Sequence, residues 1–146
     1  EVGSMDEVHP RIRSLVELWQ LRCGPDDIPR RSDLNVFALK PWLGCLTIFE
    51  EIEKGSDYLV RLDGQGVVEL TGAEWTGRRV SQLGNGQPLL KALRSVQASR
   101  QPLIDPLYFP AKGKLLVFSR ALLPVWDDKR AAGQVIQCLW PVPDPS

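Results

Sequence analysis

Few residues of this chain have the types and the spacing that catalysis requires. His9 is the only histidine, and it directly precedes Pro10, outside every strand that the sequence predicts. A serine–histidine–aspartate triad and a histidine-rich metal site both need a histidine within the fold. The three cysteines, Cys23, Cys45 and Cys138, are far apart and form no CxxC pair. We therefore predict neither a catalytic residue nor a metal site.

Two carboxylate pairs and one glycine-rich stretch also lack the arrangement that chemistry would need. Glu50 with Glu51, and Asp127 with Asp128, are sequence neighbours. Neighbours in a strand point to opposite faces, so neither pair could work together as acid and base, and we interpret them as surface carboxylates. The stretch GQGVVELTG over 64–72 is neither a GxGxxG motif nor a Walker loop. Its glycines predict turns between short helices.

Composition restricts the classes of partner and the compartment. The chain has 18 lysines and arginines against 18 aspartates and glutamates, so no net charge attracts nucleic acid or an anionic membrane surface. No apolar run approaches the roughly 20 residues of a membrane span, and no signal-peptide pattern is present. An odd number of separated cysteines indicates reduced thiols. We predict a cytoplasmic protein that binds neither nucleic acid nor membrane.

Hydrophobic periodicity predicts an α+β fold. Three segments have the character of helices, apolar residues alternate in 46–52 and 58–62, a glycine-broken stretch follows, and three further extended segments close the sequence. Short connections imply antiparallel hairpins, so we predict a five-stranded antiparallel sheet with short helices on one face and an N-terminal amphipathic helix. The predicted helices span 10–23, 33–44 and 88–99, with short turns over 64–83, and the strands span 46–52, 58–62, 102–109, 115–125 and 134–140.

The length of 146 residues fits one domain with a single core. We place this domain over 10–141. Residues 1–9 are interpreted as a tag remnant or a disordered start, and residues 142–146 as a tail.

Four stretches of the chain resemble a known family, and together they cover nearly all of it. They are LVELWQLRCG over 15–24, IPRRSDLNVFALKPWLGCLTIFEEI over 28–52, YLVRLDGQGVVELTGAEWTGRRVSQL over 58–83 and SRALLPVWDD over 119–128. The most specific signal is the joint presence of Arg-Leu-x-Gly from Arg61, Glu-Leu-x-Gly from Glu69 and Thr-Gly-Arg from Thr76. In these features the chain resembles the standalone PAS-like proteins common in alphaproteobacteria.

The resemblance implies a PAS fold, in which the sheet and the small helices enclose a pocket. Arg31, Ser32 and Asp63 depart from the family pattern, and Asp63 is expected to alter the sheet near the pocket mouth. PAS domains with flavin photochemistry carry a cysteine in the stretch that corresponds to 64–77, where this chain has none. No cofactor is therefore expected, although a small apolar or amphipathic ligand fits the pocket that the family implies.

Apolar stripes from several predicted elements could line that pocket, or simply fill a core. They come from the second strand, the small-helix region, the long helix and the last strands, and arginines near the mouth could orient a ligand. The candidate ligand-binding residues are Tyr58, Val60, Leu62, Val67, Leu70, Trp75, Leu83, Leu93, Val117, Leu123, Trp140, Arg61 and Arg78, with Asp63 and Arg120 also near the mouth.

The N-terminal helix supplies a candidate interface between two copies of the chain. Its stripe of Ile12, Leu15, Val16 and Trp19 would be exposed unless the sheet or a second copy covered it. The family resemblance also implies that this helix often mediates dimerisation. We therefore predict a homodimer.

The leading hypothesis is a non-catalytic PAS-type regulatory module that binds a small ligand or a signalling partner protein. A second hypothesis is a pure dimerisation or scaffold domain without a ligand. A third is a small cone-shaped α+β enzyme that uses Tyr58, Asp63 and Trp75 within an apolar cavity, and a buried carboxylate with a raised pKa would favour it.

Overall fold

The computed structural model describes residues 8–24, 28–84, 86–111 and 113–142. Much of the predicted start (1–9) and tail (142–146) therefore lies outside the described residues. The helices are α1 (Pro10–Arg22), α2 (Val36–Leu39), α3 (Gln65–Thr71) and α4 (Gly86–Ser99), with short 3₁₀ turns η2 (Lys40–Cys45), η3 (Glu53–Gly55) and η4 (Val80–Gln82). The strands are β1 (Leu46–Ile52), β2 (Asp57–Asp63), β3 (Leu103–Ala111), β4 (Lys114–Asp127) and β5 (Ala132–Pro141).

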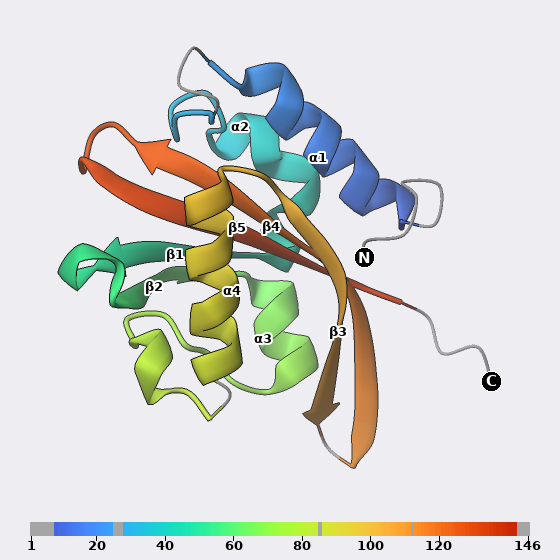
Figure 1. Cartoon of the computed structure of the whole chain (residues 1–146). Coiled ribbons are helices and arrows are strands. Elements are labelled where there is room, and N and C mark those ends of the chain that lie inside the picture. Colours follow the sequence, from blue (N-terminus) through green and yellow to red (C-terminus); the bar gives the residue numbers. More distant parts are fainter. Residues whose placement is uncertain (1–7, 25–27, 85, 112, 143–146) are drawn as a thin grey trace.

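The strands form one antiparallel sheet in the order β2-β1-β5-β4-β3. Three neighbouring pairs are sequence-local hairpins, whereas the pairing of β1 with β5 joins the two ends of the domain (Figure 1). The helices between β2 and β3 are therefore free to lie over one face of the sheet. The predicted α+β class with a five-stranded antiparallel sheet is confirmed.

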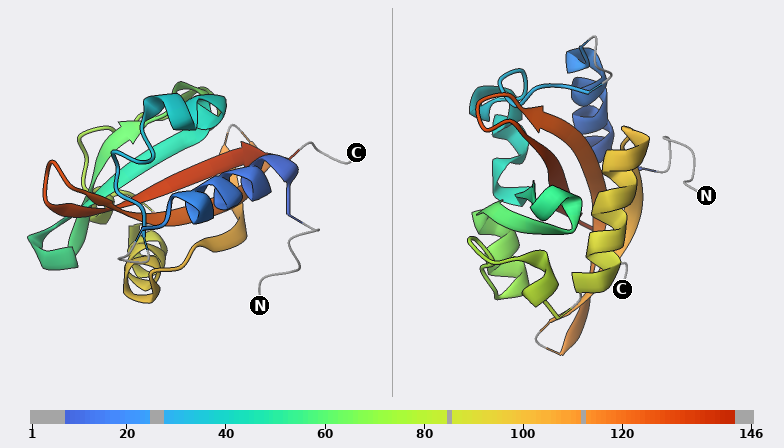
Figure 2. Two further views of the ribbon diagram at one scale, coloured as in Figure 1. Left: turned by 90° about the horizontal axis from the view of Figure 1, so that it is seen from above. Right: turned by 60° about the vertical axis from the view of Figure 1, so that its left-hand side comes forward.

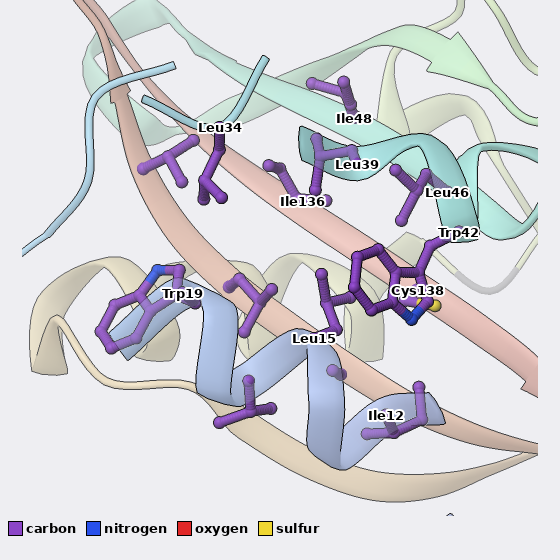
Figure 3. Close-up of a cluster of buried hydrophobic side chains, with 14 residues drawn as sticks. Ile12, Leu15, Trp19, Leu34, Leu39, Trp42, Leu46, Ile48, Ile136 and Cys138 are labelled. Atoms are coloured by element: carbon purple, nitrogen blue, oxygen red, sulfur yellow. The ribbon is translucent and has the colours of Figure 1, made fainter. Parts of the chain in front are cut away.

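Helix α1 begins where the sequence predicts, with Pro10 in its first turn and the His9 side chain accepting a hydrogen bond from the amide of Arg11. Its apolar stripe packs on the sheet together with α2 and η2 (Figure 3). Asn35 caps α2 by accepting from the amide of Ala38, and Pro41 restricts the continuation to a 3₁₀ turn. The short helix of 33–44 thus lies beside α1, and not with the other small helices.

The opposite face of the sheet carries α3, η4 and α4. Seen from above, α4 lies on one side of the strands and α2 on the other (Figure 2), and α1 packs on the same face as α2. Leu90, Leu93 and Val96 of α4 pack on Phe49, Tyr58, Val60, Leu122 and Val135 of the sheet. Two apolar cores, one on each face, therefore hold the strands. Among the described residues, no helix is both long and apolar enough to cross a membrane.

Candidate functional site

A cavity of about 230 Å³ lies on the α3 and α4 side of the sheet and is partly open to solvent. Its helical wall comes from α3, from Trp75 in the following loop and from the first turn of α4. Its floor comes from all strands except β2. The lining residues are Thr47, Val67, Thr71, Trp75, Pro88, Leu89, Leu107, Phe109, Arg120, Gln137 and Leu139.

The walls of the cavity are apolar and partly aromatic. The rings of Trp75 and Phe109 are tilted by 52° with their centroids 6.4 Å apart. Val67, with Leu139 and Phe118 of the sheet, forms a small apolar cluster beneath them. Such walls favour a ligand with substantial apolar surface.

The floor is polar because three buried side chains of the sheet face the cavity. Thr47 of β1 and Gln137 of β5 are direct cross-strand neighbours, and Arg120 of β4 lies opposite Leu139, two residues along β5 from Gln137. Gln137 and Arg120 are only 5% and 8% exposed. A mainly apolar cavity with a few buried polar groups is the usual form of a small-molecule site.

Arg120 is held by Asp105 of the edge strand β3, its direct neighbour in the β3–β4 pair. Nε and one Nη atom of Arg120 donate to the two carboxylate oxygens of Asp105, both at 2.7 Å. This bidentate geometry fixes the guanidinium plane against the cavity floor. The pair also leaves the floor without net charge from these two residues.

Asp63 connects the sheet to the cavity wall from the end of β2. One of its oxygens accepts from the Thr47 hydroxyl at 2.9 Å, and the other accepts from the backbone amide of Trp75 at 3.2 Å. Burial raises the pKa of the Asp63 carboxyl, and these two hydrogen bonds offset only part of the shift. The predicted position of Asp63 near the pocket mouth thus has a structural role, because this residue anchors the loop that carries Trp75.

Replacing Asp63 by asparagine tests this assignment through pH. With its pKa raised in the folded chain, Asp63 contributes stability that is present below about pH 3.9, the ordinary pKa of aspartate, and lost as the pH rises through the raised value. The wild-type chain is therefore expected to lose stability relative to Asp63→Asn over that window. Urea unfolding of both proteins between pH 3 and pH 8 measures the difference. A difference that grows in favour of the wild type with pH would contradict the raised pKa.

Glycines at 64 and 66 let the start of α3 approach the backbone of Gly44 and Leu46 closely. A Cβ atom on Gly64 would lie 2.6 Å from the carbonyl oxygen of Gly44 and 2.8 Å from that of Leu46, and one on Gly66 would lie 2.7 Å from the same Gly44 oxygen. The sequence predicted turns for these glycines. Their tertiary role is to allow backbone contact, which positions the α3 wall of the cavity.

Of the predicted pocket residues, Val67 and Trp75 line the cavity, and so does Arg120, which was predicted near the mouth. Tyr58, Val60 and Leu93 lie on the same side of the sheet but belong to the neighbouring core, where each is fully buried. The Tyr58 hydroxyl donates to Gln97, and burial raises the pKa of Tyr58 to about 12. These three side chains fill space and do not face the cavity.

The remaining predicted pocket residues do not line the cavity, for two physical reasons. A β-bulge at Arg61 breaks the alternation of β2, so Leu62 pairs with Ile48 on the opposite face, where it is 40% exposed. Strand alternation likewise places Val117, Leu123 and Trp140 on the α1 side. Arg61, Arg78 and Leu70 are exposed, and Leu83 is half-buried away from the cavity. The predicted residues that lie on the opposite face are Leu62, Val117, Leu123 and Trp140.

The predicted dimer stripe is covered by the chain itself. Ile12, Leu15, Val16 and Trp19 are between 0% and 3% exposed because they pack against Leu123, Val125 and Ile136 of the sheet (Figure 3). The Trp19 indole also donates to the carbonyl of Pro124 at 2.8 Å. The assignment of these four side chains to a homodimer interface is therefore wrong, since the same chain already buries them.

Apart from Val67, Trp75 and Arg120, the lining residues were not predicted, although the floor carries a signal in the sequence. Thr47, Arg120 and Gln137 are polar residues within otherwise apolar strands, at positions that alternation assigns to a buried face. Such residues point to a cavity or to an internal hydrogen-bond network. Thr71, Pro88, Leu89, Leu107, Phe109 and Leu139 carry no comparable signal.

Glu50 was predicted to be a surface carboxylate, and this is wrong. It is 5% exposed on the α1 side, where it accepts from Nε of Arg130 at 2.7 Å and from the amide of Gln134 at 2.9 Å. Burial opposes ionisation, but the hydrogen bonds from Arg130 and Gln134 outweigh it and lower the pKa of Glu50. Together, Glu50, Arg130 and Gln134 connect β1, the β4–β5 turn and β5, and they lie apart from the cavity.

Asp63 is the buried carboxylate with a raised pKa that the enzyme hypothesis required. However, both of its oxygens accept hydrogen bonds from the chain, and neither Asp63 nor Tyr58 lines the cavity. A general base must reach the proton that it removes. The proposed group of Tyr58, Asp63 and Trp75 therefore lacks the geometry of an active site. Among the described residues, no cluster of three or more histidine, cysteine, aspartate or glutamate side chains could hold a metal ion.

Comparison with solved structures shows the same fold in sensory proteins. A light-oxygen-voltage domain that was studied with a flavin analogue is 17% identical to this chain. Its TM-score is 0.54, over 75% of this chain and 84% of that one. The Aureochrome1 light-oxygen-voltage domain is 16% identical, with a TM-score of 0.54 over 75% and 83%. The PAS domain of Bordetella pertussis BvgS is 14% identical, with a TM-score of 0.53 over 75% and 86%. At these identities the likeness shows the fold alone.

The family assignment comes from the sequence itself. A family model of the PAS domain matches residues 7–105, which is more than half of the chain. No curated protein matches it. The alphaproteobacterial origin of the resemblance stays a prediction. The five-stranded sheet, the helices between β2 and β3 and the matched family model agree, and the chain belongs to the PAS domain family.

Proposed function

We propose that the chain is a non-catalytic sensory module that responds to a small, mainly apolar ligand bound in the cavity between α3, α4 and the sheet. The observation that carries this proposal is the cavity of about 230 Å³ with apolar walls and a buried polar floor. Protein interiors are normally close-packed, so a core that served only stability would not be expected to contain a cavity of this size. The PAS family membership supports a role in signalling.

The volume limits the size of the ligand. A cavity of roughly 150 Å³ is enough to hold benzene, whereas pockets for drug-sized ligands run from about 300 to 1,000 Å³. The 230 Å³ here falls between these values and suits one ring or two fused rings. We therefore propose a ligand of roughly ten non-hydrogen atoms.

We propose that flavin, which the name of one structural neighbour includes, is not the ligand of this cavity. The described lining residues include no cysteine, and Cys45 and Cys138 belong to the core on the opposite face. The volume is also below the range for a ligand of that size. The sequence prediction that no cofactor is bound thus becomes part of the proposal, supported by the character of these walls.

The response to a ligand would pass through the elements that surround it. The cavity contacts α3, the Trp75 loop, α4 and the edge strand β3, and the last of these carries the exposed Tyr108 on its other face. A signalling partner and a second copy of the chain both remain proposed binders, without assigned interface residues. Cys45 and Cys138 form no disulfide, in keeping with the proposed cytoplasmic location.

The test is native mass spectrometry of the purified chain, followed by the denatured mass. We expect the wild type to carry a small molecule that is lost on denaturation. Leu107→Trp fills the cavity from β3 and is expected to remove the extra mass. Tyr108→Trp is the matched control, because it introduces the same ring at the neighbouring position on the opposite, exposed face.

A chain purified without a bound molecule is tested with naphthalene as the probe. Titration followed by ¹H–¹⁵N correlation spectra should show saturable shifts at Val67, Trp75 and Leu107, and Leu107→Trp should abolish them. The proposal would be contradicted if no molecule co-purified with the chain and naphthalene did not bind saturably. Equal binding by wild type and Leu107→Trp would also contradict it, since the ligand would then lie elsewhere.

A further inference from the structure

The polar floor of the cavity contains hydrogen-bonding atoms that the described part of the chain does not satisfy. Gln137 is 5% exposed and lines the cavity, yet its side-chain amide makes no hydrogen bond with a described residue. Arg120 donates to Asp105 through Nε and Nη2, while Nη1 has no partner among the described residues. Among the described residues, the fully buried side-chain atom that lacks a partner is Oε1 of Gln134 on the α1 side, so the unpaired atoms of Gln137 and Arg120 are reached from the cavity. Their hydrogen-bond partner therefore comes from outside the chain, as a ligand or as water.

The electrostatics of the floor disfavour an anionic ligand. Arg120 is already neutralised by the bidentate contact with Asp105 at 2.7 Å. Thr47 donates its hydroxyl to Asp63, so its proton is not available to an anion. A carboxylate in the cavity would lose part of its hydration without an unpaired positive charge to compensate, because the Arg120 guanidinium is already paired with Asp105.

The unsatisfied atoms match a neutral group with an acceptor beside a donor. Nη1 of Arg120 can only donate, whereas Gln137 offers an acceptor in its carbonyl and donors in its amine. The two residues lie on adjacent strands and diagonal to one another across the sheet, within reach of long side chains. A carboxylate has only acceptors and would leave the Gln137 carbonyl without a partner.

Resting on the proposed ligand-binding function, we propose that the cavity binds a neutral, planar lactam or amide ring. The ring carbonyl accepts from Nη1 of Arg120, and the adjacent ring N–H donates to the Gln137 side-chain carbonyl. The apolar part of the ring packs against Trp75 and Phe109, whose tilted rings form the opposite wall. Asp105 is a positioning residue, because it holds the guanidinium in place.

The test compares four ligands of similar size by calorimetry or fluorescence titration: 2-quinolinone, its N-methyl derivative, naphthalene and 2-naphthoate. One charge-assisted hydrogen bond from Arg120 and one neutral hydrogen bond to Gln137 should make 2-quinolinone bind about tenfold or more tightly than naphthalene. Methylation of the ring nitrogen removes the N–H donor, so the N-methyl derivative should lose most of the affinity advantage of 2-quinolinone over naphthalene. 2-Naphthoate should bind more weakly than 2-quinolinone.

Gln137→Leu is the decisive variant, since leucine has a similar volume and no polar atoms. It should abolish the preference for 2-quinolinone over its N-methyl derivative while leaving the affinity for naphthalene within about threefold. Because it removes a buried amide without a partner, it should also unfold at an equal or higher urea concentration than wild type. This second measurement shows that any loss of lactam binding does not come from loss of the fold.

The outcomes separate the two proposals. Naphthalene binding that Leu107→Trp blocks, with no preference for the lactam, would overturn the lactam assignment and leave the ligand-binding function intact. Tighter binding of 2-naphthoate that Gln137→Leu does not change would also overturn it, and would identify Arg120 as an anion anchor. Failure of all four ligands, together with the absence of a co-purified molecule, would contradict the proposed function itself.

Discussion

Trp19→Ala is expected to lower the free energy of unfolding by about 3–5 kcal/mol, the usual cost of replacing a large buried aromatic residue by alanine. Trp19 is 3% exposed, and its indole nitrogen donates to the carbonyl of Pro124 at 2.8 Å. The substitution removes a ring from the core between α1 and the sheet, and it leaves the Pro124 carbonyl without this donor. Urea unfolding followed by circular dichroism measures the loss.

Leu21→Ala provides the matched control, because Leu21 lies in the same helix and is 82% exposed. It should change stability by no more than about 0.5 kcal/mol. Sedimentation of both variants tests the abandoned dimer assignment at the same time. If Trp19→Ala were as stable as wild type but dissociated a dimer, α1 would pack against a second copy and not against its own sheet.

Gly64→Ala at the N-cap of α3 is expected to destabilise the fold by about 1–3 kcal/mol, because the added methyl group overpacks a close backbone contact. The backbone of Gly64 has φ −64°, which any residue adopts, so the cost is purely steric. The added methyl group would lie 2.6 Å from the Gly44 carbonyl oxygen, and backbone atoms cannot rotate away as a side chain can. Relief of this contact requires α3 to move from the sheet.

Gly84→Ala is the control, since a Cβ atom there meets nothing within 4 Å. It should be neutral or slightly stabilising, because it reduces the freedom of the unfolded chain. Gly64→Ala should also weaken naphthalene binding, as α3 carries Val67 and Thr71 into the cavity wall. Equal stability of the two alanine variants would show that α3 does not contact Gly44 as described.

The secondary structure was largely predictable because it follows from local periodicity. The helix from Pro10, the strand from Leu46 and the hairpin between β1 and β2 all begin within a residue of the predicted positions. Helix α4 starts at Gly86, two residues before the predicted Pro88, because helix starts depend on local contacts that periodicity does not report. The order of elements and the PAS-like motifs were enough to predict the fold class.

The cavity was less predictable because it depends on which strand faces meet. The β-bulge at Arg61 exchanges the faces of Leu62 and Asp63, and no local signal in the stretch YLVRLD distinguishes a bulge from regular alternation. A similar ambiguity affected Leu123 and Trp140, which are apolar like true lining residues but lie on the opposite face. Apolar character alone does not say which core a side chain enters.

The sequence by itself determined the class of fold, the family and the scarcity of catalytic side chains, since these depend on residue types and their local spacing. Only the tertiary structure decided that α1 covers its own sheet, that Gly64 and Gly66 bring α3 against the backbone at Gly44, and that Thr47, Arg120 and Gln137 meet beneath one cavity. The physical reason is that the antiparallel pairing of β5 with β1 joins residues far apart in the chain, and local periodicity carries no information about that pairing.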